Sequence, residues 1–292
     1  MMSEWKQFKK VKYYLSKFMN IKYYQINGEI KRSDKALISV DDYGLMRGYG
    51  IFETIRFNNK KLLKINRHID RLYKGLSIIK IKIEHISREK LIADINNLVE
   101  INNIENGLIK LVITKGTPGA SNNITPNIYI TIKNIYSMPK EPVKVVFLSE
   151  SKYPIVRFSP SFKGINYVGN MMAIEDAEND GAFECVFVDD NNNITECSMR
   201  NIFFINNQTL ITPALSLGIL SGTTRYEIQN LAKLNNIDCI EKIINKTEVD
   251  DMDEAFICSS AIGILPCYWN GWKSDYKITK KLQFLLEESL QK

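Results

Sequence analysis

The order of hydrophobic and polar residues predicts an α+β arrangement in the first half of the chain. Short strands are expected in three segments: two strands within 23–30, one at 51–57, where apolar and polar residues alternate as in a half-buried strand, and one at 61–65. Asn27-Gly28 predicts a hairpin turn inside the first of these segments. From Arg67 the apolar residues follow a helical spacing, and Ser87 is a candidate N-cap for a second helix. Two further strands, LIKLVITKG and NIYITIKNI, are expected on either side of a loop at 116–126.

Beyond a proline-containing segment the pattern changes, and a second domain is expected. Apolar runs predict strands at VKVVFL, FECVFV, NIFFI, TLIT, IDCIEKI and EAFICSS. Helices are predicted at about 169–179, at about 223–235 and from about Thr279 onward. The expected divisions are a helical N-terminal extension at 1–22, a smaller α+β domain at 23–137, a linker at 138–143 and a larger domain at 144–292.

The composition is that of an ordinary globular protein. The 292 residues are 45% hydrophobic and 25% charged, and no apolar run approaches the roughly 18 residues that a membrane-spanning helix needs. The formal net charge of +6 is spread along the chain, whereas nucleic-acid binding calls for clustered basic residues. The five cysteines form no CxxC pair and no secretory signal opens the chain, so we expect reduced thiols in a cytoplasmic protein. Neither of the two histidines, His68 and His85, lies near a cysteine, and no metal site is expected.

A lysine, a carboxylate and a hydroxyl-rich turn stand out in the second half of the chain. Lys163 lies in FKGINY, among aromatic residues and with no acid between 154 and 174; partial desolvation of this kind favours the unprotonated amine. Glu196 follows an Asp/Asn-rich turn and by itself resembles a solvent-facing acid, but if it enters the core it needs a cationic partner. Residues 221–225, SGTTR, open a predicted helix and provide either a phosphate seat or a plain helix cap.

Three smaller signals accompany this trio. His68 and Arg71 are three residues apart and share one face of a predicted helix, where simple solvation is the plainer explanation. The segment DYGLMRGYGIFET carries three glycines between residues 44 and 50, which indicates close backbone approach or positive φ. A second small polar turn, SSA, follows the predicted strand EAFIC.

In this order, the motifs resemble those of the class IV aminotransferases, the fold-type IV enzymes that use pyridoxal 5′-phosphate (PLP). The family includes branched-chain aminotransferases, D-amino acid aminotransferases and 4-amino-4-deoxychorismate lyases. The resemblance runs from about residue 27 to residue 271 and is carried by RGYGIFETIR, HIDRL, KGINY, TECSMRN, SGTTR and the SSA…P segment. It implies a two-domain α+β or α/β fold with the smaller domain first, PLP in the cleft between the domains, and a homodimer.

The resemblance also assigns roles to individual residues. Lys163 would form the aldimine with PLP and shuttle a proton, Glu196 would bind the pyridine nitrogen, and Tyr167 would contact the cofactor's 3′-oxygen. The phosphate would be held by four residues: Arg71, Thr223, Thr224 and Ser260. Phe52 would lie beside the substrate as an aromatic wall. Four basic residues are candidates for binding the substrate: Arg47, Lys115, Arg157 and Arg200.

The expected reaction is amino-group transfer between an amino acid and a 2-oxo acid. The loop TPGASNNIT lacks the Arg-x-His pair of the D-amino acid aminotransferases, and the Tyr-x-Arg pattern of branched-chain enzymes is not evident nearby. A 4-amino-4-deoxychorismate lyase, which eliminates pyruvate to give 4-aminobenzoate, is the alternative, and TEC resembles that group. A non-catalytic binding protein that keeps the fold is a third reading, which the presence of both Lys163 and Glu196 disfavours.

Overall fold

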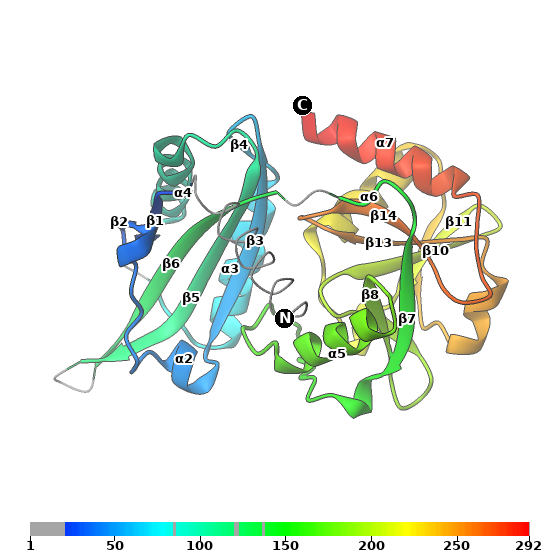
Figure 1. Cartoon of the computed structure of the whole chain (residues 1–292), viewed down its shortest axis with the longest axis horizontal. Coiled ribbons are helices and arrows are strands. Elements are labelled where there is room, and N and C mark those ends of the chain that lie inside the picture. The colour runs from blue at the N-terminus through cyan, green and yellow to red at the C-terminus, as the bar shows by residue number, and fades with distance from the viewer. Residues whose placement is uncertain (1–20, 84–85, 120–122, 136–137, 292) are drawn as a thin grey trace, which may run out of the picture. The chain divides into compact units, whose positions relative to one another are not determined.

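The computed structural model describes residues 21–83, 86–119, 123–135 and 138–291. Residues 1–20 of the predicted N-terminal extension lie outside this part. Contacts within the chain separate two compact units, Met1–Tyr136 and Ser137–Lys292. Each unit has its own sheet and its own helices (Figure 1).

The first unit is a six-stranded antiparallel sheet with the order β2-β1-β6-β5-β3-β4. Its strands are β1 (Tyr23–Ile26), β2 (Glu29–Arg32), β3 (Gly50–Asn58), β4 (Lys61–Leu62), β5 (Gly107–Pro118) and β6 (Ile124–Asn134). Its helices are α2 (Tyr43–Arg47), α3 (Ile65–Ile78) and α4 (Arg88–Asn102), with a 3₁₀ turn η1 (Ser33–Lys35). The helix α3 contacts β3, and α4 contacts β1 and β6.

Local sequence explains most of these elements. The predicted hairpin is confirmed, because Asn27 and Gly28 both adopt positive φ, 51° and 85°, between β1 and β2. The N-cap prediction is also confirmed, since the Ser87 side chain accepts a hydrogen bond from the third residue of α4. The predicted strand at 61–65 is too long: Lys64 adopts a left-handed conformation and α3 begins at the next residue.

The predicted loop at 116–126 is also corrected by the structure. The β5–β6 ladder continues to the pair Pro118 and Ile124, after a register shift between Thr114 and Thr117. A bulge of this kind bends and twists the strands while their pairing continues. Most of the expected loop therefore belongs to the two longest strands of the sheet.

The second unit holds an eight-stranded mixed sheet with the order β12-β11-β10-β13-β14-β7-β8-β9. Its strands are β7 (Val143–Ser149), β8 (Glu184–Val188), β9 (Ile194–Cys197), β10 (Asn201–Asn206), β11 (Thr209–Pro213), β12 (Cys239–Lys242), β13 (Glu254–Ser259) and β14 (Gly263–Tyr268). Its helices are α5 (Val168–Asn179), α6 (Thr223–Leu234) and α7 (Lys277–Gln291), with 3₁₀ turns η2 (Glu150–Lys152), η3 (Leu215–Leu217) and η4 (Lys246–Asp251). The strands β7 and β8 are parallel, as are β14 and β7, and β11 and β12.

The central strands of this sheet are buried on both faces. Ile202 and Phe204 of β10 belong to one core cluster, and Phe203 and Ile205 belong to another, because successive side chains of a strand point to opposite faces. The second cluster is covered by apolar residues of α6 and α7. Burial on both faces explains why the four residues from Ile202 to Ile205 are all apolar.

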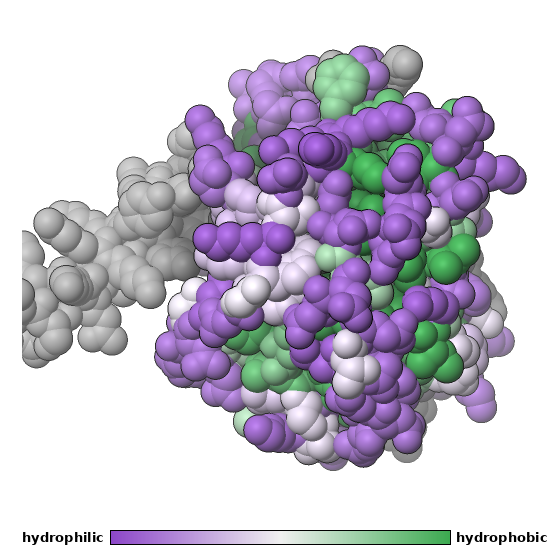
Figure 2. Space-filling view, turned by 90° about the vertical axis from the view of Figure 1, so that its right-hand side faces the viewer, coloured by the Kyte–Doolittle hydropathy of each residue, from purple (hydrophilic) through white to green (hydrophobic). Residues whose placement is uncertain are grey.

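The surface is polar with scattered apolar residues. Hydrophilic residues dominate the face seen in Figure 2, and hydrophobic residues interrupt them in several places, which is ordinary for a folded protein. Among the helices of the described segments, none is long and apolar enough to cross a membrane.

Candidate active site

Lys163 lies in the segment between η2 and α5, next to a phenol. Its Nζ donates a hydrogen bond to the Tyr167 hydroxyl at 3.0 Å, and Tyr167 is the residue that precedes α5. Two aromatic rings of the same segment, Phe158 and Phe162, have centroids 4.2 Å apart. The structure therefore places the amine, the phenol and the aromatic residues in one short segment.

Glu196 on β9 is not a solvent-facing turn acid. Its side chain is 14% exposed, and its Oε1 accepts a hydrogen bond from Arg157. Its Oε2 accepts hydrogen bonds from the Leu220 backbone N–H at 3.2 Å and the Asn201 amide at 3.3 Å. Burial raises the pKa of Glu196, although Arg157, the Leu220 N–H and Lys163 all favour its ionised form. The carboxyl is thus poised to take another cation or a proton.

Arg157 connects two carboxylates. Its Nε and Nη2 donate to the two oxygens of Glu150 at 2.7 and 3.0 Å, and its Nη1 donates to Glu196. A third acceptor is the Thr195 hydroxyl at 3.1 Å. The negative charges of Glu196 and Glu150 outweigh the effect of burial and raise the pKa of Arg157. Arg157, a candidate for binding the substrate, is thus paired with Glu196, the acid that was expected to bind the pyridine nitrogen of PLP.

The SGTTR motif divides into two parts with different surroundings. No side chain caps α6, so the plain-cap reading is wrong. Thr223 Oγ1 lies 2.9 Å and Thr224 Oγ1 lies 3.5 Å from the Ser260 Oγ, so three hydroxyls meet at the N-terminus of α6. Arg225 is buried elsewhere: its Nη2 donates to the Pro213 carbonyl at 3.0 Å and lies 3.1 Å from Glu241. The first part is a candidate phosphate seat, and Arg225 fastens the helix to the sheet.

In the first unit, Glu53 holds His68 and Arg71 together. Glu53 on β3 is 1% exposed; His68 Nδ1 lies 2.7 Å from Oε2, and Arg71 donates through Nε and Nη2 at 2.7 and 2.6 Å. Burial raises the pKa of Glu53, but Arg71 and His68 outweigh it and lower that pKa to about 2. The shared face of His68 and Arg71 is confirmed, and His68 is buried rather than solvated. Glu53 was not among the residues predicted from the sequence, although it lies in the segment RGYGIFETIR.

The glycine-rich segment is fastened by a second buried acid, which sequence reasoning also missed. Asp42 is fully buried and accepts hydrogen bonds from the Gly44 N–H at 2.6 Å, the Thr114 hydroxyl at 2.9 Å, the Asn127 amide at 2.6 Å and the Tyr129 hydroxyl at 2.7 Å. A Cβ on Gly44 would lie 2.2 Å from Thr114 Cγ2, so the predicted close approach is confirmed. Burial opposes ionisation, yet these donors lower the pKa of Asp42.

The remaining substrate candidates lie in different surroundings. In the first unit, Phe52 on β3 is buried, Arg47 ends α2 with an exposed side chain, and Lys115 on β5 donates to a backbone carbonyl just past α3 at 3.3 Å. In the second unit, Arg200 forms an ion pair with the fully buried Glu184.

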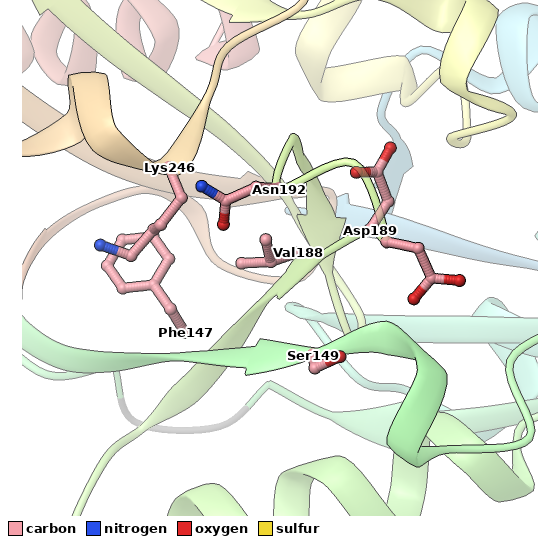
Figure 3. Close-up of a pocket in the computed structure, with 7 residues that line it drawn as sticks. Phe147, Ser149, Val188, Asp189, Asn192 and Lys246 are labelled. Carbon is pink, nitrogen blue, oxygen red and sulfur yellow. The ribbon is translucent and has the colours of Figure 1, made fainter.

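A separate pocket opens at the ends of β7 and β8. The pocket has a volume of about 420 Å³ and is drawn in Figure 3; its lining is Phe147, Ser149, Val188, Asp189, Asp190, Asn192 and Lys246. The Lys246 amine lies 4.1 Å from the centroid of the Phe147 ring. None of the residues expected to hold PLP belongs to this lining, so the pocket is not the expected cofactor site.

Comparison with known proteins shows the family. The model of the class IV amino-transferase family matches residues 50–268. D-alanine aminotransferase of Listeria monocytogenes serotype 4b is 31% identical over 280 residues, 91% of this chain and 96% of that protein. The branched-chain aminotransferase from Thermoproteus uzoniensis, crystallised with norvaline, has a TM-score of 0.84 at 24% identity, over 92% of this chain and 95% of that one. A putative 4-amino-4-deoxychorismate lyase of Legionella pneumophila has a TM-score of 0.79 at 26% identity, over 88% of this chain and 97% of that one.

The fold and the site thus define an enzyme of the class IV aminotransferase type. The chain belongs to the class IV aminotransferase family. The expected two-domain α+β fold of the fold-type IV enzymes is confirmed.

Proposed function

We propose that the protein is a PLP-dependent aminotransferase that moves an amino group between an amino acid and a 2-oxo acid. The family match and the relatives named as aminotransferases support the reaction class. One observation carries the proposal: the second unit combines a lysine beside a phenol, a largely buried carboxylate and a hydroxyl-lined helix N-terminus.

These residues fit PLP by their chemistry. The Lys163 amine can react with the aldehyde of PLP. The Glu196 carboxylate can pair with the protonated ring nitrogen, and burial raises the pKa of Glu196. When bound, PLP supplies a conjugated ring that takes up electrons from the substrate's α-carbon. Lys163 would move the proton between that carbon and the cofactor's C4′ atom. Tyr167, 3.0 Å from the amine, would contact the 3′-oxygen and orient Lys163.

The phosphate would bind where hydroxyls and backbone N–H groups meet. Thr223, Thr224 and Ser260 provide hydroxyls at the N-terminus of α6, where the helix dipole favours an anion. Arg71 is proposed as the fourth phosphate-binding residue, as the resemblance implies. The bidentate contact with Glu53 would fix the plane of its guanidinium.

The surroundings of the four cations narrow the choice for the substrate carboxylate. Arg157 and Arg200 each lie against a carboxylate of the second unit, and a guanidinium already paired with an acid attracts a second anion less strongly. This favours Arg47 and Lys115 of the first unit for the substrate carboxylate, with Phe52 as the aromatic wall. We further propose that the protein acts in the cytoplasm as a homodimer.

The second candidate function is 4-amino-4-deoxychorismate lyase. It is favoured by the likeness to the putative lyase of Legionella pneumophila, at 26% identity. Both reactions begin with removal of the substrate's α-proton by the same lysine. They differ in whether the substrate carries a leaving group at the next carbon, which is a property of the substrate rather than of Lys163.

Absorbance and borohydride trapping test the cofactor proposal. Purified protein with added PLP should be yellow, and borohydride should bleach the band and leave the cofactor on Lys163. Lys163→Ala should lose this adduct, whereas Lys152→Ala, an exposed lysine of η2 in the same unit, should keep it. A wild-type protein that stays colourless and ignores PLP would refute the proposal.

Product assays separate the two reactions. The protein is incubated with a panel of L- and D-amino acids plus a 2-oxo acid, and separately with aminodeoxychorismate. Transfer to the 2-oxo acid supports the aminotransferase. Release of pyruvate and 4-aminobenzoate without any transfer would instead establish the lyase.

A further inference from the structure

Asn201 occupies the point where the candidate acid meets the candidate phosphate seat. It is the first residue of β10, is 6% exposed and pairs with Cys258 on β13. Its Nδ2 donates to the Leu220 carbonyl at 3.0 Å and lies 3.3 Å from Glu196 Oε2. The Leu220 N–H donates to the same Glu196 oxygen at 3.2 Å. The amide, the carboxylate and the Leu220 peptide groups therefore form a closed set of contacts.

The other side of the amide packs against the start of α6. Gly222 is the N-cap of this helix, and a Cβ built there would lie 2.0 Å from Asn201 Oδ1 and 3.2 Å from its Cγ. Contacts under 3.0 Å do not occur for real Cβ atoms, so glycine is what allows the amide to lie so close. Asn201 thus contacts the helix N-terminus through packing and Glu196 through a hydrogen bond.

The third connection runs through β13. Asn201 is paired with Cys258, which is two residues before Ser260, and the Ser260 hydroxyl meets Thr223 at 2.9 Å. The position of one buried side chain is consequently linked to the acid on β9, to the N-cap of α6 and to β13, the strand that ends just before Ser260. A small displacement of this amide would change the distance between the acid and the three hydroxyls.

We propose that Asn201 is a positioning residue that sets the spacing between Glu196 and the hydroxyl-lined N-terminus of α6, so that one ligand reaches both. The inference rests on the proposed binding of PLP, which carries its ring nitrogen and its phosphate as separate groups on one molecule. Asn201 itself contacts neither group: it acts through Glu196, Leu220 and Gly222. The two ends of the site are therefore coupled, and a change at Asn201 affects both together.

The first test compares two asparagines of the same strand. Asn201→Ala is set beside Asn206→Ala, whose side chain lies at the far end of β10 and bonds the Asp251 carbonyl at 3.2 Å. PLP affinity is measured by titrating the apoprotein and following absorbance, and the melting temperature of each apoprotein is recorded without PLP. Loss of hydrogen bonds to buried groups should weaken PLP binding roughly tenfold in Asn201→Ala and shift the wavelength of the bound band. Asn206→Ala should leave affinity and wavelength unchanged.

A double-variant cycle tests the contact itself. In the wild type, Gly222→Ala forces the new Cβ onto the Asn201 amide and should weaken PLP binding by more than tenfold. In an Asn201→Ala background the two nearest atoms, Oδ1 and Cγ of Asn201, are gone and the next neighbour of the new Cβ is the Arg225 Cβ at 3.3 Å, so the same Gly222→Ala change should weaken PLP binding much less than in the wild type. If the alanine variant does not fold, Asn201→Ser takes its place in both experiments.

The outcomes separate this inference from the proposed function. A wild type without any borohydride-reducible PLP adduct overturns both. A wild type that binds PLP, with Asn201→Ala indistinguishable from Asn206→Ala in affinity and spectrum, overturns the positioning role alone. Additive effects of Gly222→Ala and Asn201→Ala also overturn it, whereas a non-additive cycle supports it.

Discussion

Replacing Glu53 with glutamine removes the carboxylate that His68 and Arg71 share in the first unit. The cost can be worked from the pKa of Glu53, which is lowered from 4.5 to about 2. A difference of about 2.5 units corresponds to about 3 kcal/mol of stability at neutral pH. Removing one partner of a buried ion pair independently costs about 3–5 kcal/mol. Both routes predict that Glu53→Gln destabilises the first unit by about 3 kcal/mol at pH 7.

The sign of the pH dependence follows from the direction of the shift. The folded-state pKa of Glu53 lies below its ordinary value of 4.5, so its contribution is fully present above about pH 4.5. That contribution is lost as the pH falls from about 4.5 towards 2, because the folded protein must then take up the proton against the pull of Arg71 and His68. The wild type should therefore lose its advantage over Glu53→Gln across that interval.

The assay must report on the first unit alone. The tryptophans of the described residues, Trp269 and Trp272, belong to the second unit, so fluorescence is a poor probe. Amide hydrogen exchange of β3 and α3, measured at pH 7 with increasing urea, reports on the cluster directly. Glu100→Gln is the matched control, because Glu100 is an ion-paired acid of the same unit with a 62% exposed side chain, and it should cost less than about 1 kcal/mol. A Glu53→Gln cost below about 1 kcal/mol would refute the reasoning.

Three further predictions concern other parts of the molecule. Arg157→Met should raise the pKa of Glu196 further, because it removes the strongest charge that opposes the effect of burial; ¹³C-carboxyl NMR titration of the apoprotein measures this, and an unchanged or lower pKa would contradict it. Gly44→Ala places a Cβ 2.2 Å from Thr114 Cγ2 and should cost about 1–3 kcal/mol in hydrogen-exchange stability of the first unit; Thr114→Ser lacks that methyl and should recover part of the loss, and no recovery would exclude the clash as the cause. Phe203→Ala removes a fully buried ring stacked on Phe256 with centroids 5.0 Å apart and should cost about 3–5 kcal/mol; tryptophan-fluorescence unfolding detects this, with the 60% exposed Phe284 replaced by alanine as the control, and equal effects of the two variants would contradict it.

Elements with a local signal could be predicted from the sequence, whereas the partners of the strands, which are set by long-range pairing, could not. The Asn27-Gly28 hairpin and the Ser87 cap each depend on residues within one turn of each other. The strand β14 was not predicted, and Pro266 within it is a residue that speaks against a strand. In the structure Pro266 pairs opposite Phe256 of β13, and the far end of β14 pairs with β7, more than a hundred residues earlier.

The candidate site shows the same limit. Lys163 and Tyr167 are four residues apart, and their contact lies within a segment that the sequence already marked out. The partners of Glu196 and Arg71 are different: Arg157 is 39 residues before Glu196, and Glu53 is 18 residues before Arg71. The sequence shows which arginines and acids are present, but not which of them are in contact. Tertiary structure was needed to show that Arg157 lies against an acid of the site.

The pairing also explains why Glu196 remains suited to a further cation. Its carboxylate already has one guanidinium, but Arg157 divides its hydrogen bonds between Glu196 and Glu150. Two carboxylates therefore share one positive charge, so part of the negative charge of Glu196 is not neutralised. Burial of Glu196 makes that part energetically more costly. A carboxyl in this state has a raised pKa, since either a proton or a new cation lowers its free energy. If Arg157 paired with Glu196 alone, it would neutralise the carboxylate, and Glu196 would have less tendency to bind a proton or a second cation. The position of Glu150 beside Arg157 therefore helps Glu196 to bind a further cation.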